Sequence, residues 1–330
     1  MTPVTIPSTN LFGTYGATAE DNGRVVTLYL VPIGSHGVAR AVSVRNRVAA
    51  PASDDGVRPP LIPREYAREP HRSEQLAPDS ARLVWSEDGD GVALFERDEL
   101  VAYIPPPGEG AEKGGYSAYT IGDYKWGEAL SEPARKLATE RFLKAESQSH
   151  QIEAPQFWSD AHASILRKLE SPFGPHTGFW LGESGRIPSL AVAQFSRDGG
   201  STLYISVGMS ALAMPGGGET RVEVALITDD APEWAPKTIA WLARYPWANA
   251  TAIAHGDIIL VPGLEPAWFA PDCSAILITN ASNSSPMPLL LAHPITLDQQ
   301  RFAARHGAEA LIAQLYSPSA PVNASITTPI

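Results

Sequence analysis

The sequence contains a single cysteine, Cys273, among its 330 residues. An intramolecular disulfide is therefore impossible, and so is a zinc or iron–sulfur site built from several cysteines. The first residues have neither a basic start nor an apolar core, so they do not predict a secretory signal. Apolar runs such as Leu289 to Ala292 are far too short to span a bilayer. These absences predict a cytoplasmic protein that does not act in a membrane.

Basic side chains are outnumbered by acidic ones, 25 to 36, which gives a formal net charge of −11. The chain has no basic stripe of the kind that neutralises phosphates, and this argues against binding to nucleic acid. An acidic surface mildly favours a basic protein partner.

Motifs for catalysis and for ligand binding are incomplete. The segment Gly208–Leu212 lacks the second glycine of a nucleophile elbow, and Gly216–Gly218 precedes a predicted strand where a phosphate loop needs a helix. There is no His-Glu-x-x-His pattern, and the eight histidines are scattered. We therefore expect no cofactor, no metal and no enzymatic activity. A hydrolase site assembled in space from dispersed histidines and acids stays an alternative.

The first half of the chain predicts β-structure. Apolar and β-branched runs bounded by turn residues indicate strands at 24–31, 38–48, 83–85, 92–95 and 100–104. Residues 50–80 are rich in proline and arginine and have no apolar period, which predicts a long loop. We expect a β-rich N-terminal domain over residues 1–150.

The second half mixes strands with helices. Strands are predicted at 190–195, 202–207, 221–227, 258–261, 275–278 and 288–292, and helices near 131–144, 155–169, 230–245 and 296–315. His162 shares a helix face with Trp158 and Ile165, which favours a packed, hydrogen-bonded histidine. The third helix should end before Pro246, and Gly307 should bend or divide the fourth. With a boundary near Ser147 to Glu153, residues 151–330 form the second predicted domain.

Tryptophan is the remaining unusual feature, with eight residues in the chain. Trp234, Trp241 and Trp247 gather around one predicted helix. Tryptophans are common binding anchors because they bury a large area and keep an N–H donor. Their helical spacing is more often that of core residues.

Five motifs in a fixed order distinguish the second half. A Tyr-Ile-Ser-x-Gly-hydrophobic-Ser strand is followed by a Glu-containing strand, a Leu-Ala-Arg-Tyr helix end, a Gly-Asp strand entry and a closing helix. They stand at Leu203–Ser210, Val222–Leu226, Leu242–Tyr245, His255–Asp257 and Thr296–Leu315. In this order they resemble the suppressor-of-fused domain, and the resemblance covers residues 151–316.

The resemblance implies an α+β fold with mixed sheets and flanking helices, a domain without known catalytic activity. Animal members are implied to restrain a transcription factor in the cytoplasm by binding one of its peptides as an added strand. Bacterial relatives resemble immunity proteins that neutralise toxins from competing cells. Tyr204 is the first partner-binding residue that the resemblance implies, and Trp241 and Trp247 are the other two candidates. Ala211 stands where the family often has an acidic residue, a departure that bears on the partner motif.

Alanine, proline and arginine usage suggests a bacterial genome. The leading hypothesis is therefore a non-enzymatic immunity protein that binds a basic polymorphic toxin. The first alternative is an intracellular scaffold or regulator that binds an endogenous protein by strand addition. The second is the dispersed-site hydrolase.

Overall fold

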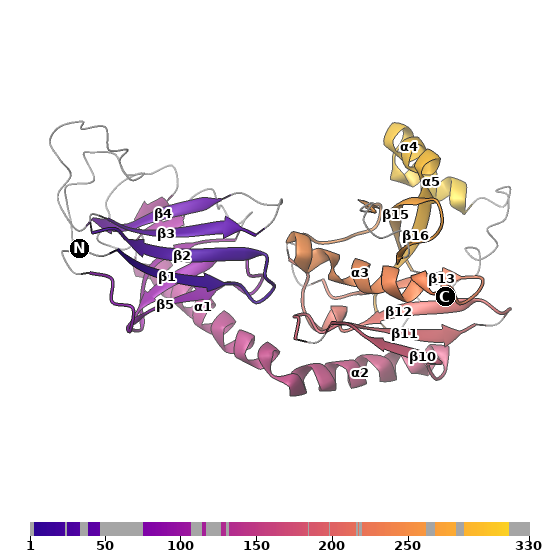
Figure 1. Ribbon diagram of the computed structural model, residues 1–330, viewed down its shortest axis with the longest axis horizontal. Helices are drawn as coiled ribbons and strands as arrows, with labels where there is room; N and C mark the ends of the chain where they lie inside the picture. The colour runs from indigo at the N-terminus through magenta and orange to yellow at the C-terminus, as the bar shows by residue number, and fades with distance from the viewer. Residues whose placement is uncertain are drawn as a thin grey trace. The chain divides into compact units, whose positions relative to one another are not determined.

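The computed structural model describes residues 3–23, 25–33, 39–46, 75–106, 114–116, 127–129, 132–183, 185–197, 199–215, 217, 220–261, 268–281 and 287–316. Two compact units make up the chain (Figure 1). The N-terminal unit comprises residues 1–153 and 248–250, and the C-terminal unit comprises residues 154–247 and 251–330. Most of the predicted loop at 50–80 lies outside the described residues. The division into the two predicted domains, 1–150 and 151–330, stays a prediction.

The N-terminal unit is built from two sheets and one helix. A four-stranded antiparallel sheet has the order β1-β2-β3-β4 and a second sheet the order β5-β6-β7-β8-β9. The helix α1 (Glu132–Glu153) packs Ala138 and Phe142 against the second sheet. The strands are β1 (Val4–Thr9), β2 (Tyr15–Asp21), β3 (Val25–Pro32), β4 (Arg40–Asn46), β5 (Ala81–Trp85), β6 (Val92–Glu96), β7 (Glu99–Ile104), β8 (Gly114–Tyr116) and β9 (Gly127–Ala129).

Sequence reasoning missed the first two of these strands. In β2, Tyr15, Ala17 and Ala19 are buried in alternation, but two of the three are alanines, so the hydrophobic signal is weak. Their partners Leu28 and Leu30 in β3 supply most of the apolar volume on the same face. A strand of small residues is therefore defined by its neighbour's packing, which a single-sequence pattern does not show.

The C-terminal unit is one seven-stranded sheet with helices on its faces. The strand order is β10-β11-β12-β13-β16-β15-β14, in which β13 and β16 are parallel and the other pairs antiparallel. The strands are β10 (Gly178–Leu181), β11 (Ala191–Ser196), β12 (Thr202–Val207), β13 (Glu223–Thr228), β14 (Ile258–Leu260), β15 (Cys273–Asn280) and β16 (Leu289–Thr296). The helices are α2 (Pro155–Phe173), α3 (Trp234–Asn249), α4 (Leu297–His306), α5 (Ala308–Leu315) and the short 3-10 helix η1 (Met209–Ala211).

Helices α2 and α3 lie on opposite faces of this sheet (Figure 1). Ile165 and Leu169 of α2 pack against Leu203 and Ile205 of β12. Because side chains alternate along a strand, Tyr204 points to the opposite face, toward the beginning of α3. His162 on α2 is half-buried, and its Nε2 lies 2.8 Å from the carbonyl oxygen of Ser189. The predicted packed, hydrogen-bonded histidine is confirmed.

Two predictions about α3 are wrong. The helix begins at Trp234, after Pro232, and it continues through Pro246 to Asn249. A proline inside a helix removes one backbone hydrogen bond at a cost of about 3 kcal/mol. Burial of Trp247, directly after Pro246, offsets this cost because a large aromatic side chain leaves water. Tertiary packing therefore outweighs the local stop signal.

Other local signals were read correctly. The Thr-Leu-Asp-Gln sequence at 296–299 has the pattern of a capping box, and the structure forms one: the Thr296 side chain accepts from the Gln299 N–H, and Gln299 Oε1 accepts from the Thr296 N–H. Gly307 has a φ of +89° and separates α4 from α5, as its position in the sequence predicted. The α+β class with mixed sheets and flanking helices is also confirmed.

Candidate functional site

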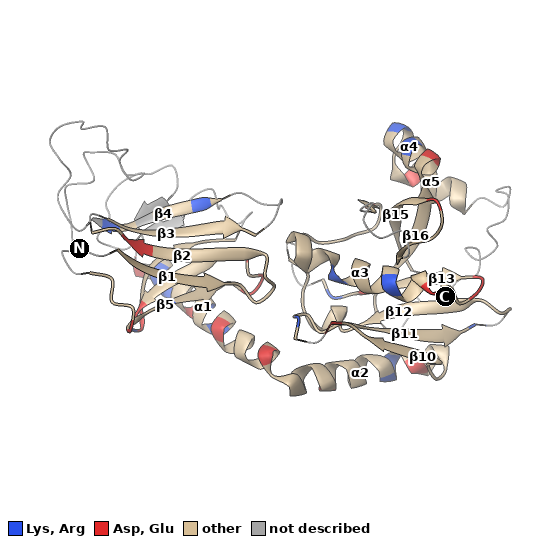
Figure 2. Cartoon of the chain, in the orientation of Figure 1, with Lys and Arg blue, Asp and Glu red and all other residues tan. Residues whose placement is uncertain are grey.

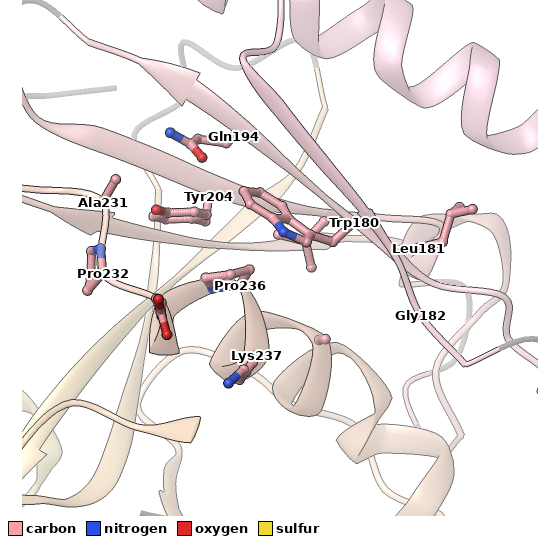
Figure 3. Close-up of a pocket in the computed structure, with 12 residues that line it drawn as sticks. Trp180, Leu181, Gly182, Gln194, Tyr204, Ala231, Pro232, Pro236 and Lys237 are labelled. Atoms are coloured by element: carbon pink, nitrogen blue, oxygen red, sulfur yellow. The ribbon is translucent and has the colours of Figure 1, made fainter. Parts of the chain in front are cut away.

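A groove lies between the beginning of α3 and the β10 edge of the sheet (Figure 3). Its volume is about 490 Å³. We call it the β10 groove. Its lining comes from β10 and the residue after it, from β11 and β12, and from the start of α3: Trp180, Leu181, Gly182, Val192, Gln194, Tyr204, Ala231, Pro232, Glu233, Pro236, Lys237 and Ala240.

The strand register explains why these side chains converge. Trp180 pairs with Val192, and Gln194 pairs with Tyr204, so all four lie on one face of the sheet. The indole of Trp180 lies back over Gly178: a Cβ placed on that glycine would be 2.7 Å from the Trp180 ring. Gly178 therefore leaves room for the indole to form one wall of the groove.

Strand β10 is the edge of the described sheet, and its outer backbone groups have no strand beside them. The Gly182 N–H donates to the Leu190 carbonyl at 2.8 Å. Hydrogen-bonding residues alternate along an antiparallel strand, so Gly178 and Trp180 also face β11. The backbone N–H and C=O groups of Phe179 and Leu181 therefore point away from the sheet. A free edge of this kind is a template for pairing with another chain.

Apolar side chains accompany this free backbone. Trp180 is 41% exposed and Leu181 is 72% exposed. Sequence reasoning missed both residues. The available signal was the run Gly178-Phe179-Trp180-Leu181-Gly182, in which glycines bracket three large apolar side chains.

Tyr204, predicted to contact a partner, lies in the floor of the β10 groove. Its side chain is only 1% exposed, and its ring centroid is 6.0 Å from that of Trp180. Burial raises the pKa of the phenol, and the nearby Asp230 raises it further. Tyr204 therefore supports Trp180, and direct contact with a partner would require the indole to move.

The other two predicted binding residues lie outside the groove lining. Trp241 is half-buried and packs edge-on against Tyr245 and Phe269, with ring centroids 5.7 and 5.2 Å away. Trp247 is 2% exposed in the core. A role for either in binding stays a prediction, and their present contacts are those of packing residues.

A second polar cluster surrounds Glu223, which is fully buried in β13. One carboxylate oxygen accepts from the Ser210 hydroxyl at 2.6 Å and from the backbone N–H groups of Ser210 and Gly208 at 2.9 and 3.2 Å. The other accepts from the Ser206 hydroxyl at 2.5 Å and from the Met209 N–H at 3.2 Å. Both faces of β13 are covered, so nearly all of its residues are buried.

Burial raises the pKa of Glu223 to about 7, although the hydrogen bonds from Ser206, Ser210 and Gly208 act in the opposite direction. The cluster gives a physical reason for the serines and glycine of the Tyr-Ile-Ser-x-Gly-Met-Ser motif. Gly208 has a φ of +114°, and a Cβ there would lie 2.5 Å from the Ser189 carbonyl. These residues hold the turn after β12 against β13.

Histidines and acids meet elsewhere only in small groups. His255 lies 3.0 Å from Glu309, and His176 lies 2.7 Å from Glu170, both in exposed positions. Over the described ranges, no group of three or more histidine, cysteine, aspartate or glutamate side chains is arranged to hold a metal ion. None of the described helices is long and apolar enough to cross a membrane.

Comparison with known proteins finds a family model that is similar to part of this chain. Residues 187–323 match the family model described as suppressor of fused protein (SUFU), which covers about two fifths of the chain. No curated protein matches the sequence.

Solved structures with similarity include a suppressor of fused homologue from Neisseria gonorrhoeae, with 17% identity and a TM-score of 0.39 over 48% of this chain and 89% of that one. A Sufu–Fu complex shows 14% identity and a TM-score of 0.37 over 48% of this chain and 84% of that one. Drosophila Suppressor of Fused shows 11% identity and a TM-score of 0.34 over 48% of this chain and 47% of that one. The family match falls on the half that carries the five motifs, and the predicted resemblance of that half to the suppressor-of-fused domain is confirmed.

Proposed function

We propose that this chain is a non-enzymatic protein-binding module and that its partner binds as a strand added along β10. The observation that carries the proposal is the free β10 edge, where Trp180 and Leu181 are exposed beside a groove. The family match supports it, because one suppressor of fused structure is a complex of Sufu with Fu.

Strand addition at this edge would combine two kinds of interaction. The outward groups of Phe179 and Leu181 offer up to four main-chain hydrogen bonds, each worth about 0.5–1.5 kcal/mol net. Burial of an exposed leucine or tryptophan adds about 1.5–3 kcal/mol when it is complete. Together these terms are of the same order as the cost of association, about 4–15 kcal/mol, so contacts within the groove would supply the remaining affinity.

The finer proposal is that the partner is a toxin and that this chain is a bacterial immunity protein acting in the cytoplasm. The net charge of −11 supports a basic toxin, because opposite charge steers encounter between proteins. An endogenous partner of a scaffold or regulator would use the same edge. The groove favours binding over hydrolysis, since no histidine, cysteine or serine stands among its described lining residues.

Leu181→Pro provides the test. The proline removes the outward N–H at position 181 and places its ring in the path of an added strand, while the hydrogen bond from Gly182 to Leu190 is kept. Leu181→Ala is the matched control, because it removes the side chain and keeps the N–H.

The full chain would be mixed with the toxin domain encoded beside its gene, and affinity and growth protection would be measured. We expect Leu181→Pro to weaken the complex at least tenfold beyond the effect of Leu181→Ala and to abolish protection. Equal affinities for the two variants would overturn strand addition at β10. Failure of the wild-type chain to bind and protect would overturn the immunity role.

A further inference from the structure

We propose that the β10 groove receives a cationic side chain, preferably arginine, from the strand that adds to β10. This inference rests on the proposed function and names the chemistry of its partner. It follows from three features of the groove, namely its aromatic wall, its unpaired carboxylates and the register that an added strand must adopt.

The aromatic wall is formed by Trp180 and Tyr204. Their ring centroids lie 6.0 Å apart with an interplanar angle of 42°, and Figure 3 shows both rings on the sheet side of the groove, facing Pro232 and Pro236. Trp180 keeps 41% of its surface exposed. An exposed indole is the aromatic face that attracts cations most strongly, and the planar guanidinium of arginine also stacks on such faces.

Acidic side chains stand at the end of the groove where α3 begins. Glu233 lines the groove, and Asp230 is close enough to Tyr204 to raise the pKa of its phenol. Both residues are exposed, and neither carboxylate has an ion-pair partner among the described residues. Among the lining residues Glu233 is balanced by Lys237, and Asp230, which lies outside the lining but near Tyr204, adds one further negative charge. The groove and the residues that adjoin it therefore carry one excess negative charge beside an aromatic wall.

The acidic residues do not belong to the strands that line the groove. Strands β10, β11 and β12 carry no charged residue (Figure 2). The acids come from the residues that lead into α3. Acidic residues near a helix N-terminus are stabilised by the helix dipole, which explains why the fold accepts them at this position. The dipole does not account for their position beside an exposed indole, whereas a cationic ligand does.

Register determines which residue of the partner enters the groove. An added strand pairs with the outward groups of Phe179 and Leu181, so its residue opposite Trp180 projects over the groove face. The residues on either side project to the other face, where Phe179 packs and Leu181 is exposed. The expected partner segment is therefore apolar–arginine–apolar in an extended conformation.

Two synthetic peptides probe this prediction. Acetyl-Thr-Val-Arg-Val-Thr-amide carries the arginine, and a matched peptide carries norleucine in its place. Each would be titrated into the full chain, and binding would be followed by the NMR signal of the Trp180 indole N–H, assigned with Trp180→Phe. We expect the arginine peptide to bind about 5- to 30-fold more tightly, from the cation–π and carboxylate contacts together.

A double variant separates the contribution of the two carboxylates to peptide affinity from the contribution of strand pairing. Asp230→Asn combined with Glu233→Gln should lower the affinity of the arginine peptide to that of the norleucine peptide. The affinity of the norleucine peptide should not change. Asp298→Asn with Glu309→Gln removes the same charge from exposed positions outside the groove lining and should keep the preference.

The possible outcomes distinguish this inference from the proposed function. Equal affinity of the two peptides for the wild-type chain would overturn the arginine site, and loss of both in Leu181→Pro would still support strand addition. Absence of binding by either peptide would also overturn the arginine site. The proposed function would then be judged by the toxin complex alone.

Discussion

Replacing Glu223 by glutamine tests the buried cluster that holds the turn after β12. Each carboxylate oxygen of Glu223 accepts at least one backbone N–H, from Gly208 and Ser210 on one side and from Met209 on the other. A glutamine has one oxygen and one NH₂ group, so either orientation places a donor against a backbone donor. At least one buried N–H is then left unpaired, at a cost of about 1–3 kcal/mol.

The same substitution should change the pH dependence of stability. The pKa of Glu223 is about 7 in the folded chain against 4.5 for an ordinary glutamate, so the folded state holds the proton more tightly. Its contribution is therefore fully present below about pH 4.5 and is lost as the pH rises through 7. The difference of about 2.5 pKa units corresponds to roughly 3 kcal/mol.

The measurement is the free energy of unfolding in urea for wild type and Glu223→Gln, at intervals from pH 5 to 8. Glutamine does not titrate, so the deficit of the variant should be largest near pH 5 and should shrink by up to about 3 kcal/mol toward pH 8. Glu140→Gln, an acid removed at an exposed site on α1, should show no such change. A constant difference between Glu223→Gln and wild type across this range would refute the pKa argument. Equal stability of the two proteins at pH 8, where the Glu223 carboxylate is ionised, would refute the account of the five donors.

Three further predictions concern single positions. His293 is buried, and burial lowers its pKa to about 4 from 6.5, so its contribution is present above pH 6.5 and is lost as the pH falls toward 4. His293→Gln should reduce this loss of unfolding free energy at acidic pH by up to roughly 3 kcal/mol. An unchanged dependence of the unfolding free energy on pH between 6.5 and 4 would contradict the prediction. Gly182→Ala would place a Cβ 2.6 Å from the Leu190 carbonyl oxygen. It should therefore destabilise the chain by about 1–3 kcal/mol in thermal unfolding and speed hydrogen exchange of the β10 amides. Exchange of these amides at the wild-type rate would contradict this prediction. Trp180→Leu should change stability by under about 1 kcal/mol because the indole is 41% exposed, yet it should weaken partner binding several-fold; full affinity would remove Trp180 from the interface.

Local rules predicted the parts of the fold whose cause is local. Thr296 and Gln299 form their capping box from residues three apart, and Gly307 supplies a positive φ that few other residues adopt. Pro246 was misread because the burial of Trp247 is a tertiary effect. Helix boundaries near proline are therefore the least secure of the local predictions.

The candidate site was less accessible to sequence reasoning. Tyr204 was selected through a family resemblance and lies in the β10 groove, but Trp180 and Leu181 were overlooked. Their importance depends on β10 being the edge of the sheet, and strand order is a property of topology that no local pattern encodes. Glu223 was recognised only as part of a strand motif, because burial of both faces of β13 also depends on strand order.

Backbone hydrogen exchange in the complex tests the central claim most directly. The amides of Phe179 and Leu181 point away from the sheet in the free chain, whereas Gly182 already donates to Leu190. Binding of the partner should slow exchange at Phe179 and Leu181 by at least tenfold, with little change at Gly182. A stable complex in which both outward amides exchange at the rate of the free chain would contradict strand addition at β10.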